Sequence, residues 1–301
     1  MSWRVVHITD VDKMALSLDN LKVKKGDKEV KIPLNEIFSV VIEDLTCKVT
    51  GRLLVELSKN NILLLVCNQQ HLPEMTMLPI QGHCTQYKRI KEQISWDEER
   101  KQFMWKRIIK QKIYNQIMVM QKLHVDQDRI NKLNDLLAET ELFDPSTCEA
   151  QAARIYFNSF FEDGFRRRDT DRVENAALNY GYAIINAALT RTIAAKGLIP
   201  SLGIHHIGER NAFNLSSDMI EAFRPLVDYY ILKEPPEDYL TKTYRLNLIN
   251  LLHAEVSIDG RQQTVIRAIE IFVSSFVDFF KTGDESVLKM PNMKKIAYHE
   301  L

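Results

Sequence analysis

The sequence predicts an α+β protein in which a small strand-rich amino-terminal domain precedes a larger all-helical domain. Short runs rich in Val, Ile and Leu, some of them alternating, occupy the first third of the chain. Helical periodicity begins near Thr85 and continues with few interruptions by Gly or Pro. The chain has 301 residues, 45% of them hydrophobic, so it is long enough to bury a substantial core.

The strand-rich domain is expected at residues 1–75. Its predicted strands are WRVVHIT, MALSLD, LKVKKGDKEVKIPL, IFSVVIED and ILLLVCN. Gly26-Asp27 lies where a hairpin turn is expected, and the apolar spacing of GRLLVELSKNN fits one helix. A following segment with two prolines and no clear period, LPEMTMLPIQGH, predicts a linker, placed at residues 76–85.

Helices are expected to fill residues 86–283. The predicted segments are 86–95, 98–123, 127–141, 146–163, 171–196, 217–232, 238–253 and 261–282. Asp144-Pro145 opens one of them, Lys196-Gly197 closes another, and Gly283 follows the last apolar run. Residues 284–301 are largely polar and predict a tail outside the core.

Charge and cysteine content narrow the class of protein. Forty basic residues balance forty acidic ones, so affinity for nucleic acid would have to come from uneven placement of charge. Four scattered cysteines without a CxxC pair favour reduced thiols, and His83-Cys84 has no second pair at zinc-finger spacing. MSWRVVHITDVDK lacks the apolar region of a signal peptide, and ILLLVC is too short to cross a bilayer. We therefore expect a soluble cytoplasmic protein without a membrane partner.

The stretch LGIHHIGERNAFNLSSDMIEAFRP combines residue types that bind metals. Two histidines, His205 and His206, precede Asp218 and Glu221, which lie one helical turn apart and would share a helix face. Mg²⁺ and Mn²⁺ take carboxylate oxygens, and Mn²⁺ also accepts an imidazole nitrogen. With Glu149 as a third ligand from a separate helix, the pattern predicts an open catalytic metal site.

A simpler interpretation of the same residues is also open. Ser217 or Asp218 would cap a helix, and Glu221 would complete a capping box. Glu149 would then be an exposed helical glutamate, since glutamate is a common helix former. Sequence periodicity alone does not bring Glu149 to His206.

A longer motif identifies a family that the chain resembles. NAALNYGYAIINAALTRTIAAKGLIPSLGIHHIGERNAFNLSSDMIEAFRPLVD resembles the signature of the CRISPR adaptation integrases, the Cas-one family. That signature reads N-x-x-L-N-Y-x-Y, then G-L-x-P-x-L-G-x-x-H, then N-x-F-x-L-x-x-D-x-x-E-x-F-R-P. The segment FDPS-x-x-E-x-x-ARIYFN, the amino-terminal strands and the length are similar to the type II-A-like branch. The resemblance covers essentially the whole chain.

The resemblance implies which residues form the site. Glu149, His206 and Glu221 would be both the metal ligands and the catalytic residues, with Mg²⁺ or Mn²⁺ as cofactor. His206 is chosen because it stands three residues after Gly203 in the family motif. The residues expected in supporting positions near the site are Asp218, His205, Tyr180 and Arg224. Arg224 would anchor a phosphate or orient a site carboxylate, and Tyr180 would contact the site or simply pack.

The resemblance also implies a fold, a reaction and partners. The fold would be a β-sandwich-like amino-terminal domain on a helical catalytic domain, and the protein a homodimer. Two dimers would flank a dimer of a small ferredoxin-like partner, the Cas-two protein, and insert a short DNA duplex, the spacer precursor, into a repeat array by transesterification, with endonuclease activity on the side. The effector nuclease of the system and a DNA-end-binding protein would assist in capture.

Local excesses of positive charge provide candidate DNA contacts. Residues 87–122 hold ten Lys or Arg against four acids, and an arginine triplet follows Phe165. The candidates are Lys106, Arg107, Lys110, Arg166, Arg167 and Arg168. A solvated helix face is the alternative for the first group.

Two other functions fit the same residues. A stand-alone metal-dependent nuclease of DNA repair would share the three ligands but need no partner. A helical DNA-binding scaffold would use Asp218 and Glu221 only as caps and His206 only for packing.

Overall fold

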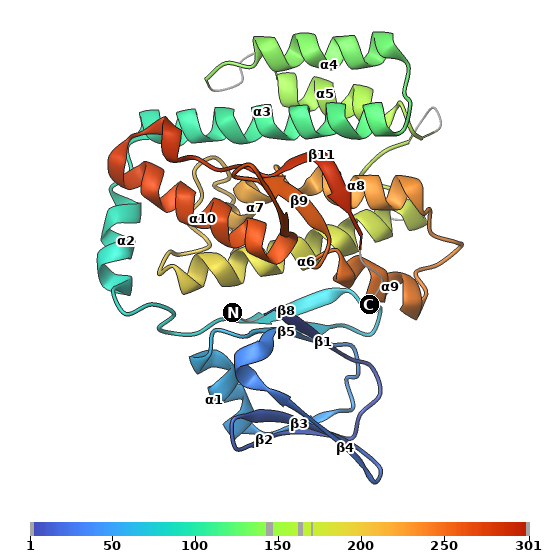
Figure 1. Ribbon diagram of the computed structural model, residues 1–301, viewed down its shortest axis with the longest axis vertical. Coiled ribbons are helices and arrows are strands. Elements are labelled where there is room, and N and C mark those ends of the chain that lie inside the picture. Colours follow the sequence, from blue (N-terminus) through green and yellow to red (C-terminus); the bar gives the residue numbers. More distant parts are fainter. Residues whose placement is uncertain (1–2, 143–146, 162–164, 170, 299–301) are drawn as a thin grey trace. The chain divides into compact units, whose positions relative to one another are not determined.

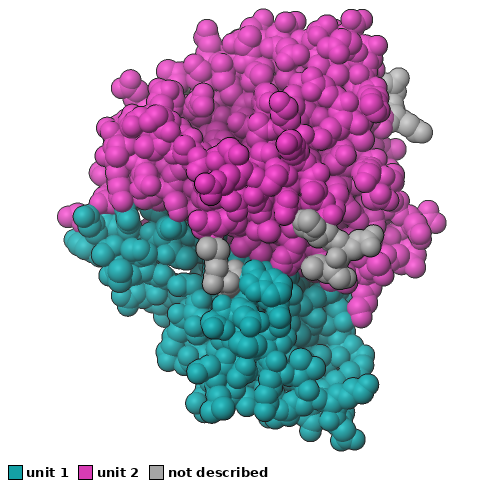
Figure 2. Space-filling view, viewed as in Figure 1, with its two compact units in different colours: residues 1–90, 190–198 teal, residues 91–189, 199–301 magenta. Residues whose placement is uncertain are grey.

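The computed structural model describes residues 3–142, 147–161, 165–169 and 171–298. It divides into two compact units, drawn in different colours in Figure 2: residues 1–90 and 190–198 form unit 1, and residues 91–189 and 199–301 form unit 2. The predicted α+β class is confirmed, with a strand-rich amino-terminal region followed by a mainly helical part (Figure 1). None of the described helices is long and apolar enough to cross a membrane.

Two four-stranded sheets are found among the described residues of unit 1. The first has the order β1-β5-β7-β8, from strands Arg4–Ile8, Ile37–Ile42, Leu63–Cys67 and Pro73–Met77. The second has the order β4-β3-β2-β6, from strands Lys28–Pro33, Asn20–Lys25, Lys13–Ser17 and Lys48–Val49. A 3-10 turn, Leu34–Glu36, precedes β5, and helix α1, Gly51–Lys59, follows β6.

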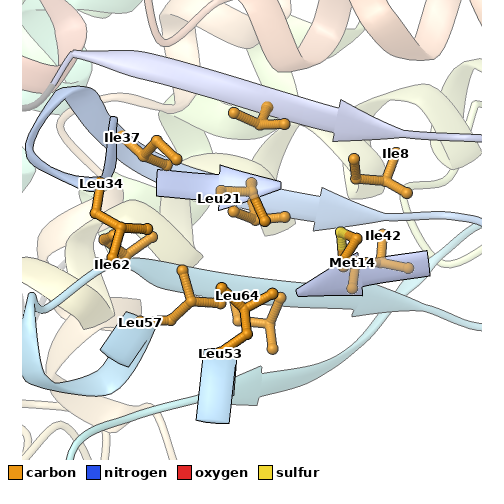
Figure 3. Close-up of a cluster of buried hydrophobic side chains, with 12 residues drawn as sticks. Ile8, Met14, Leu21, Leu34, Ile37, Ile42, Leu53, Leu57, Ile62 and Leu64 are labelled. Atoms are coloured by element: carbon orange, nitrogen blue, oxygen red, sulfur yellow. The ribbon is translucent and has the colours of Figure 1, made fainter. Parts of the chain in front are cut away.

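Both sheets and α1 contribute side chains to one hydrophobic cluster. β5 is buried along its whole length and pairs in parallel with β1 and β7, which explains its unbroken apolar run. Met14 of β2, Leu21 of β3 and Leu53 of α1 are fully buried in the same cluster (Figure 3). The predicted hairpin turn is confirmed, with Gly26 at φ +56° between β3 and β4.

One strand of unit 1 overlaps the segment predicted as a linker. β8 pairs antiparallel with β7 and ends the sheet, so Pro73 at its start needs no partner for a backbone N–H. Proline in this segment obscured the strand, because proline is also a signal for a loop.

Unit 2 is built mainly from helices. They are α3 (Glu98–Lys122), α4 (Gln127–Glu139), α5 (Cys148–Phe157), α7 (Asn214–Ile220), α8 (Arg224–Lys233), α9 (Lys242–Asn250) and α10 (Val265–Thr282). Two more, α2 (Gln86–Ile94) and α6 (Val173–Ala195), have residues in both units. α3 packs against α4, α5, α7 and α8. The start signal Asp144-Pro145 lies outside the described residues.

The prediction of an all-helical second domain is wrong. A three-stranded sheet of order β10-β9-β11 lies in unit 2, formed by Glu255–Ile258 (β9), Arg261–Thr264 (β10) and Asn292–Ala297 (β11). Asp259-Gly260, both at positive φ, form the hairpin turn between β9 and β10. The strongly helical pattern that begins at Val265 masks this Asp-Gly turn signal in the sequence.

The predicted polar tail is also corrected. β11 pairs with β9, packs against α3 and α8, and buries Met293 completely; the 3-10 turn Glu285–Val287 precedes it. A short strand needs only one or two inward side chains, so its composition stays largely polar.

The single helix predicted at 217–232 is two helices. α7 ends at Ile220 and α8 begins at Arg224, with a turn at residues 221–223 between them. Pro225 lies in the first turn of α8, where a missing N–H leaves no intrahelical bond unmade. The break places Glu221 at the end of a helix instead of in the middle of one.

Candidate active site

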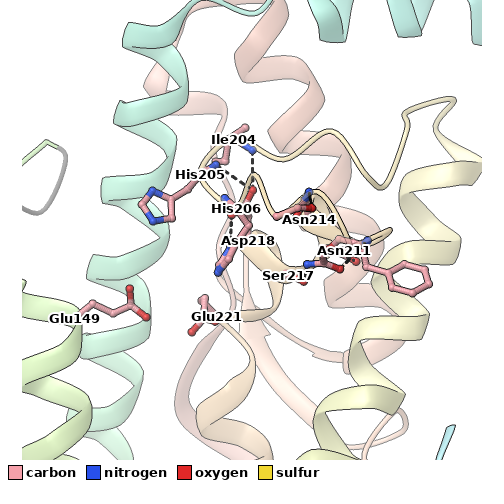
Figure 4. Close-up of polar contacts among 12 residues, drawn as sticks. Glu149, Ile204, His205, His206, Asn211, Asn214, Ser217, Asp218 and Glu221 are labelled. Atoms are coloured by element: carbon pink, nitrogen blue, oxygen red, sulfur yellow. Dashed lines mark hydrogen bonds and ion pairs between the residues drawn. The ribbon is translucent and has the colours of Figure 1, made fainter. Parts of the chain in front are cut away.

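The three predicted ligands come from separate segments of unit 2. Glu149 lies in the first turn of α5, His206 in the loop between α6 and α7, and Glu221 directly after α7. Figure 4 shows the three side chains turned toward a common region beside α3. Glu221 and Glu149 both contribute to raising the pKa of His206, although the hydrogen bond to Asp218 is the largest cause. The fold therefore brings together residues that are 72 positions apart in the chain from Glu149 to Glu221.

A buried lysine links the two glutamates. Lys112 of α3 places its Nζ 2.6 Å from Oε1 of Glu149 and 2.5 Å from Oε2 of Glu221. Burial alone would lower the pKa of Lys112, but the two carboxylates outweigh it and the pKa is raised. Burial would likewise raise the pKa of Glu221, but Lys112 and Arg224 hold that pKa below its ordinary value. The Lys112 ammonium and the Glu221 carboxylate are therefore both charged at neutral pH.

The residues fit a hard divalent cation by their chemistry. Two carboxylates and one imidazole form a donor set that Mn²⁺ accepts, and the space between the carboxylates already takes a positive charge, the Lys112 ammonium. Within the described part of the chain, no three His, Cys, Asp or Glu side chains stand close enough together to hold a metal ion. Loading of the site would thus require the Lys112 ammonium to move away.

Asp218 organises the loop that carries His206. Its carboxylate is fully buried and accepts the backbone N–H groups of Ile204 (2.7 Å), His205 (3.2 Å) and His206 (2.9 Å). Oδ1 also lies 2.6 Å from Nδ1 of His206, so Nε2 is the ring nitrogen that this contact leaves available to a ligand. A side chain at Gly203 would collide with the His206 carbonyl oxygen and approach Oδ2 of Asp218 to 2.8 Å, which explains the glycine.

The adjacent histidines His205 and His206 make different contacts. The ring of His205 stacks on Trp105 of α3, with centroids 3.9 Å apart and planes 3° from parallel. His206 meets the same indole edge-on, with a centroid distance of 5.7 Å. His205 therefore fixes the loop against α3, whereas His206 is oriented by Asp218 (Figure 4).

The capping-box interpretation is wrong. α7 begins at Asn214 after Phe213, so Ser217 and Asp218 lie inside the helix and do not cap it. The carboxylate of Asp218 instead bonds to the loop at residues 204–206. A helix that begins three residues earlier than expected accounts for the difference.

Arg224 is placed as a support for a site carboxylate. Its guanidinium lies 3.0 Å from Oε1 of Glu221 and over the ring of Tyr182, 4.9 Å from the centroid. Tyr182 belongs to the N-Y-x-Y motif on α6, and its hydroxyl donates to Asp228 of α8. Tyr180 of the same motif is fully buried. Tyr182 thus contacts both Arg224 and Asp228 of this region.

Asn115 fixes the turn that follows α7. Its amide nitrogen donates to the carbonyl oxygens of Ala222 (2.8 Å) and Pro291 (3.0 Å), and its oxygen accepts the N–H of Met293 (3.1 Å). Asn115 is fully buried, so these bonds satisfy groups that water cannot reach. The carboxyl-terminal segment therefore helps to position the turn that carries Glu221.

Sequence reasoning missed Lys112, Asn115 and Asp228 as parts of this region. Lys112 enters the sequence analysis only as one of the ten basic residues at 87–122, although it is only 6% exposed. Its spacing from Ile108 and Ile109, four and three residues earlier, places it on the apolar face of α3 and could have signalled burial. Burial raises the pKa of Asp228 to about 6, despite the hydrogen bond from Tyr182.

A cavity of about 410 Å³ adjoins Glu149. Its lining is mixed, with cationic, aromatic and acidic side chains: Lys112, Arg154, Arg167, Arg224, Phe157, Phe165, Tyr182, Glu149 and Asp228 are among them. The cavity is partly open to solvent, and Arg154, Arg167 and Arg224 make its lining a candidate contact for a phosphate.

The candidate DNA-contacting side chains differ in solvent exposure and in their bonds to other residues of the protein. Arg166 and Arg168 are exposed. Arg167 instead donates to the side-chain oxygens of Asn175 and Asn179 and lies over Tyr182, so it braces the start of α6. Lys106 and Lys110 of α3 are partly exposed, and Arg107 is exposed.

Comparison with known proteins places this arrangement in a family. The family model described as CRISPR associated protein Cas1 matches residues 6–244. A relative named CRISPR-associated endonuclease Cas1, from Neisseria meningitidis serogroup C (strain 8013), is 34% identical over 304 residues, covering 100% of this chain and 99% of its own.

Solved structures share the fold. A casposase bound to integration product matches with a TM-score of 0.72 at 20% identity, covering 99% of this chain and 95% of that one. A chain of a Cas6-RT-Cas1–Cas2 complex matches with a TM-score of 0.73 at 21% identity, covering 95% of this chain and 36% of that one. The family match over most of the chain and the full-length relative show that this protein belongs to the Cas1 family.

Proposed function

We propose that this protein is a metal-dependent DNA integrase of CRISPR spacer acquisition. It inserts short DNA duplexes into the leader-proximal repeat and has a secondary endonuclease activity. The observation that supports this most directly is the pair of carboxylates, Glu149 and Glu221, already bridged by a buried cation beside an oriented imidazole. The membership in the Cas1 family supports the CRISPR context.

The proposed reaction exchanges one phosphodiester for another. The 3'-hydroxyl oxygen of the spacer attacks a phosphorus atom of the repeat, and the bond from that phosphorus to a repeat 3'-oxygen breaks. The attacking hydroxyl loses its proton and the leaving oxygen gains one, so no ATP is needed. Water as the attacking group would give hydrolysis, which accounts for endonuclease activity.

The residues of the chain have separate parts in this chemistry. Glu149, Glu221 and Nε2 of His206 would hold Mg²⁺ or Mn²⁺, which supplies a Lewis acid for the negative charge on the reacting phosphate. Asp218 keeps Nδ1 of His206 engaged, so that Nε2 faces the site. Arg224 orients Glu221 through Oε1, while Oε2 pairs with the Lys112 ammonium.

The partners proposed are double-stranded DNA, a second copy of this chain, and a dimer of a small Cas2 partner. A structural neighbour is part of a complex whose name includes Cas2, which supports that association. The type II-A-like branch, with an effector nuclease and a DNA-end-binding protein, is proposed from the sequence resemblance alone. The protein would act in the cytoplasm.

A strand-joining assay tests this function. Purified protein with the Cas2 partner of its own operon is incubated with supercoiled repeat DNA and a labelled duplex, with Mn²⁺ or with chelator. We expect label to join the repeat only with metal and only when the duplex ends in a 3'-hydroxyl. A duplex with 3'-deoxy ends is the control.

Histidine variants provide a matched pair for the same assay. We expect His206→Ala to reduce joining by about 10³-fold, since a metal ligand is removed, and His205→Ala, its neighbour on Trp105, to reduce it far less. Cleavage without joining, with or without the partner, would favour the nuclease of DNA repair. Full DNA binding and unchanged activity in both variants would favour a scaffold.

A further inference from the structure

One face of the β4-β3-β2-β6 sheet is covered with lysines. Met14, Leu21, Val23 and Val49 point into the hydrophobic cluster of unit 1, so the residues that alternate with them point outward. The outward lysines are Lys13, Lys22, Lys24, Lys31 and Lys48, which we call the lysine face.

The register sets these lysines directly opposite one another. Lys13 is the cross-strand partner of both Lys24 and Lys48, and Lys22 is the partner of Lys31. Like charges in directly opposed positions destabilise a sheet. The arrangement therefore weakens the isolated sheet and favours binding of a polyanion that relieves the repulsion.

A single acidic residue on the strands of this face compensates the charge only in part. Glu29 of β4 stands opposite Lys24 in the register, but its carboxylate pairs with Lys22. The same carboxylate lies 3.5 Å from Lys31. Among the residues that the structure describes, Lys13, Lys24 and Lys48 have no acid within ion-pair distance. These three form an uncompensated row across β3, β2 and β6.

Protection of sheet edges does not explain the lysine face. Lysines at exposed edge strands prevent unwanted pairing, but β2 and β3 are the inner strands of this sheet. An overall excess of positive charge does not explain it either, because the chain as a whole carries forty basic and forty acidic residues. Local accumulation in an otherwise neutral protein points to a specific polyanionic partner.

We propose that the lysine face binds the phosphate backbone of duplex DNA without reading its sequence. Neighbouring strands lie ~4.8 Å apart and alternate residues ~6.7 Å apart, so the ammonium groups form a grid. Duplex DNA carries one charge per ~1.7 Å of helix axis, so the grid meets several phosphates at once. Naming DNA as the polyanion rests on the function proposed above.

Removal of the uncompensated row tests this proposal. The full-length triple variant K13Q/K24Q/K48Q is titrated against a labelled blunt DNA duplex from about 50 to 200 mM salt, without metal. We expect at least tenfold weaker binding at low salt, and a salt slope smaller by about 0.9 for each phosphate that the variant no longer neutralises. E29Q removes the compensating acid, and we expect it to strengthen binding.

A matched control has the same change in charge elsewhere. K233Q/K242Q/K281Q replaces three exposed lysines on α8, α9 and α10, and we expect binding close to that of the unaltered protein. Urea unfolding of each variant checks folding, and relief of like-charge repulsion should keep the first triple variant at least as stable as the parent.

Polyglutamate is titrated in parallel as an acidic polypeptide. The proposal is overturned if the two triple variants bind DNA equally well, or if K13Q/K24Q/K48Q weakens binding of polyglutamate but not of DNA. The titration involves no catalysis, so its result does not depend on whether strand joining is found.

Discussion

Asp218 and Glu221 lie one helical turn apart and are both buried, yet they are held by different kinds of group. Asp218 accepts three backbone N–H groups, which are fixed by the fold. Glu221 is paired with Lys112 and Arg224, whose charges lie at the ends of rotatable side chains. We therefore expect Asp218 to have a structural role and Glu221 to exchange the Lys112 ammonium for a metal ion.

The largest effect expected from this difference is on catalysis. We expect Glu221→Gln to reduce DNA cleavage and strand joining by about 10³-fold or more, because an anionic ligand is removed. Asp218→Asn should reduce them by only about 10–100-fold, since it acts through the orientation of His206. Rates at saturating DNA and metal check this, and equal reductions in the two variants would contradict the distinction.

The next largest effect concerns folding stability. Asp218→Asn replaces a carboxylate that accepts three backbone N–H groups, so we expect a decrease of about 3 kcal/mol in the free energy of unfolding. Manganese should not restore the lost stability, because the backbone N–H groups that Asp218 accepts are not among the proposed metal ligands. Urea unfolding with and without Mn²⁺ provides the measurement. A decrease that vanishes with metal would place Asp218 among the ligands.

A third prediction concerns the cation that bridges the glutamates. Lys112→Met removes the ammonium between Glu149 and Glu221, so the metal-free protein should be less stable and its affinity for Mn²⁺ about tenfold higher. Isothermal titration with Mn²⁺ measures the affinity. Lys110→Met, on the same helix but partly exposed, is the matched control. Weaker binding of Mn²⁺ by Lys112→Met would show that the lysine supports the metal instead of competing with it.

The smallest effect extends the comparison to a third carboxylate. Burial raises the pKa of Asp228 to about 6 from its ordinary 3.8, so the folded protein keeps this proton at a pH where the unfolded chain has lost it. Its contribution to stability is therefore fully present below pH 3.8 and is lost as the pH rises through about 6.

Asp228→Asn cannot ionise and still accepts the hydrogen bond from Tyr182. We expect the variant to gain on the order of 1 kcal/mol relative to the parent between about pH 4 and pH 7. Urea midpoints over this range measure the gain. A constant difference between the two proteins at every pH would contradict the assignment.

Sequence reasoning succeeded where the signal is local. The hairpin at Gly26 needs only a turn residue between two alternating runs, and the buried strand β5 needs only an apolar run between turn signals. It failed at the turn after α7 and at β9–β10, where short elements sit beside strong helical patterns.

The candidate site shows the same division. The residue types and motif order predicted Glu149, His206 and Glu221 as ligands, with Asp218 beside them, and the ligand assignment stays a prediction. The ion pair that joins the glutamates was not foreseen, because the register between α3 and the segments around it is set by packing. The lysine face was missed for a similar reason, since lysines from four strands become neighbours only through the register of the sheet.

By itself the sequence determined the α+β class, most helices, the family resemblance and the candidate ligands, because each depends on residue type and spacing along one segment. Only the tertiary structure decided which histidine faces Asp218, which lysine lies between the glutamates and which lysines share a sheet face. Those outcomes depend on contacts between distant segments. Such contacts are selected by burial and charge pairing over the whole fold, which spacing along one segment does not encode.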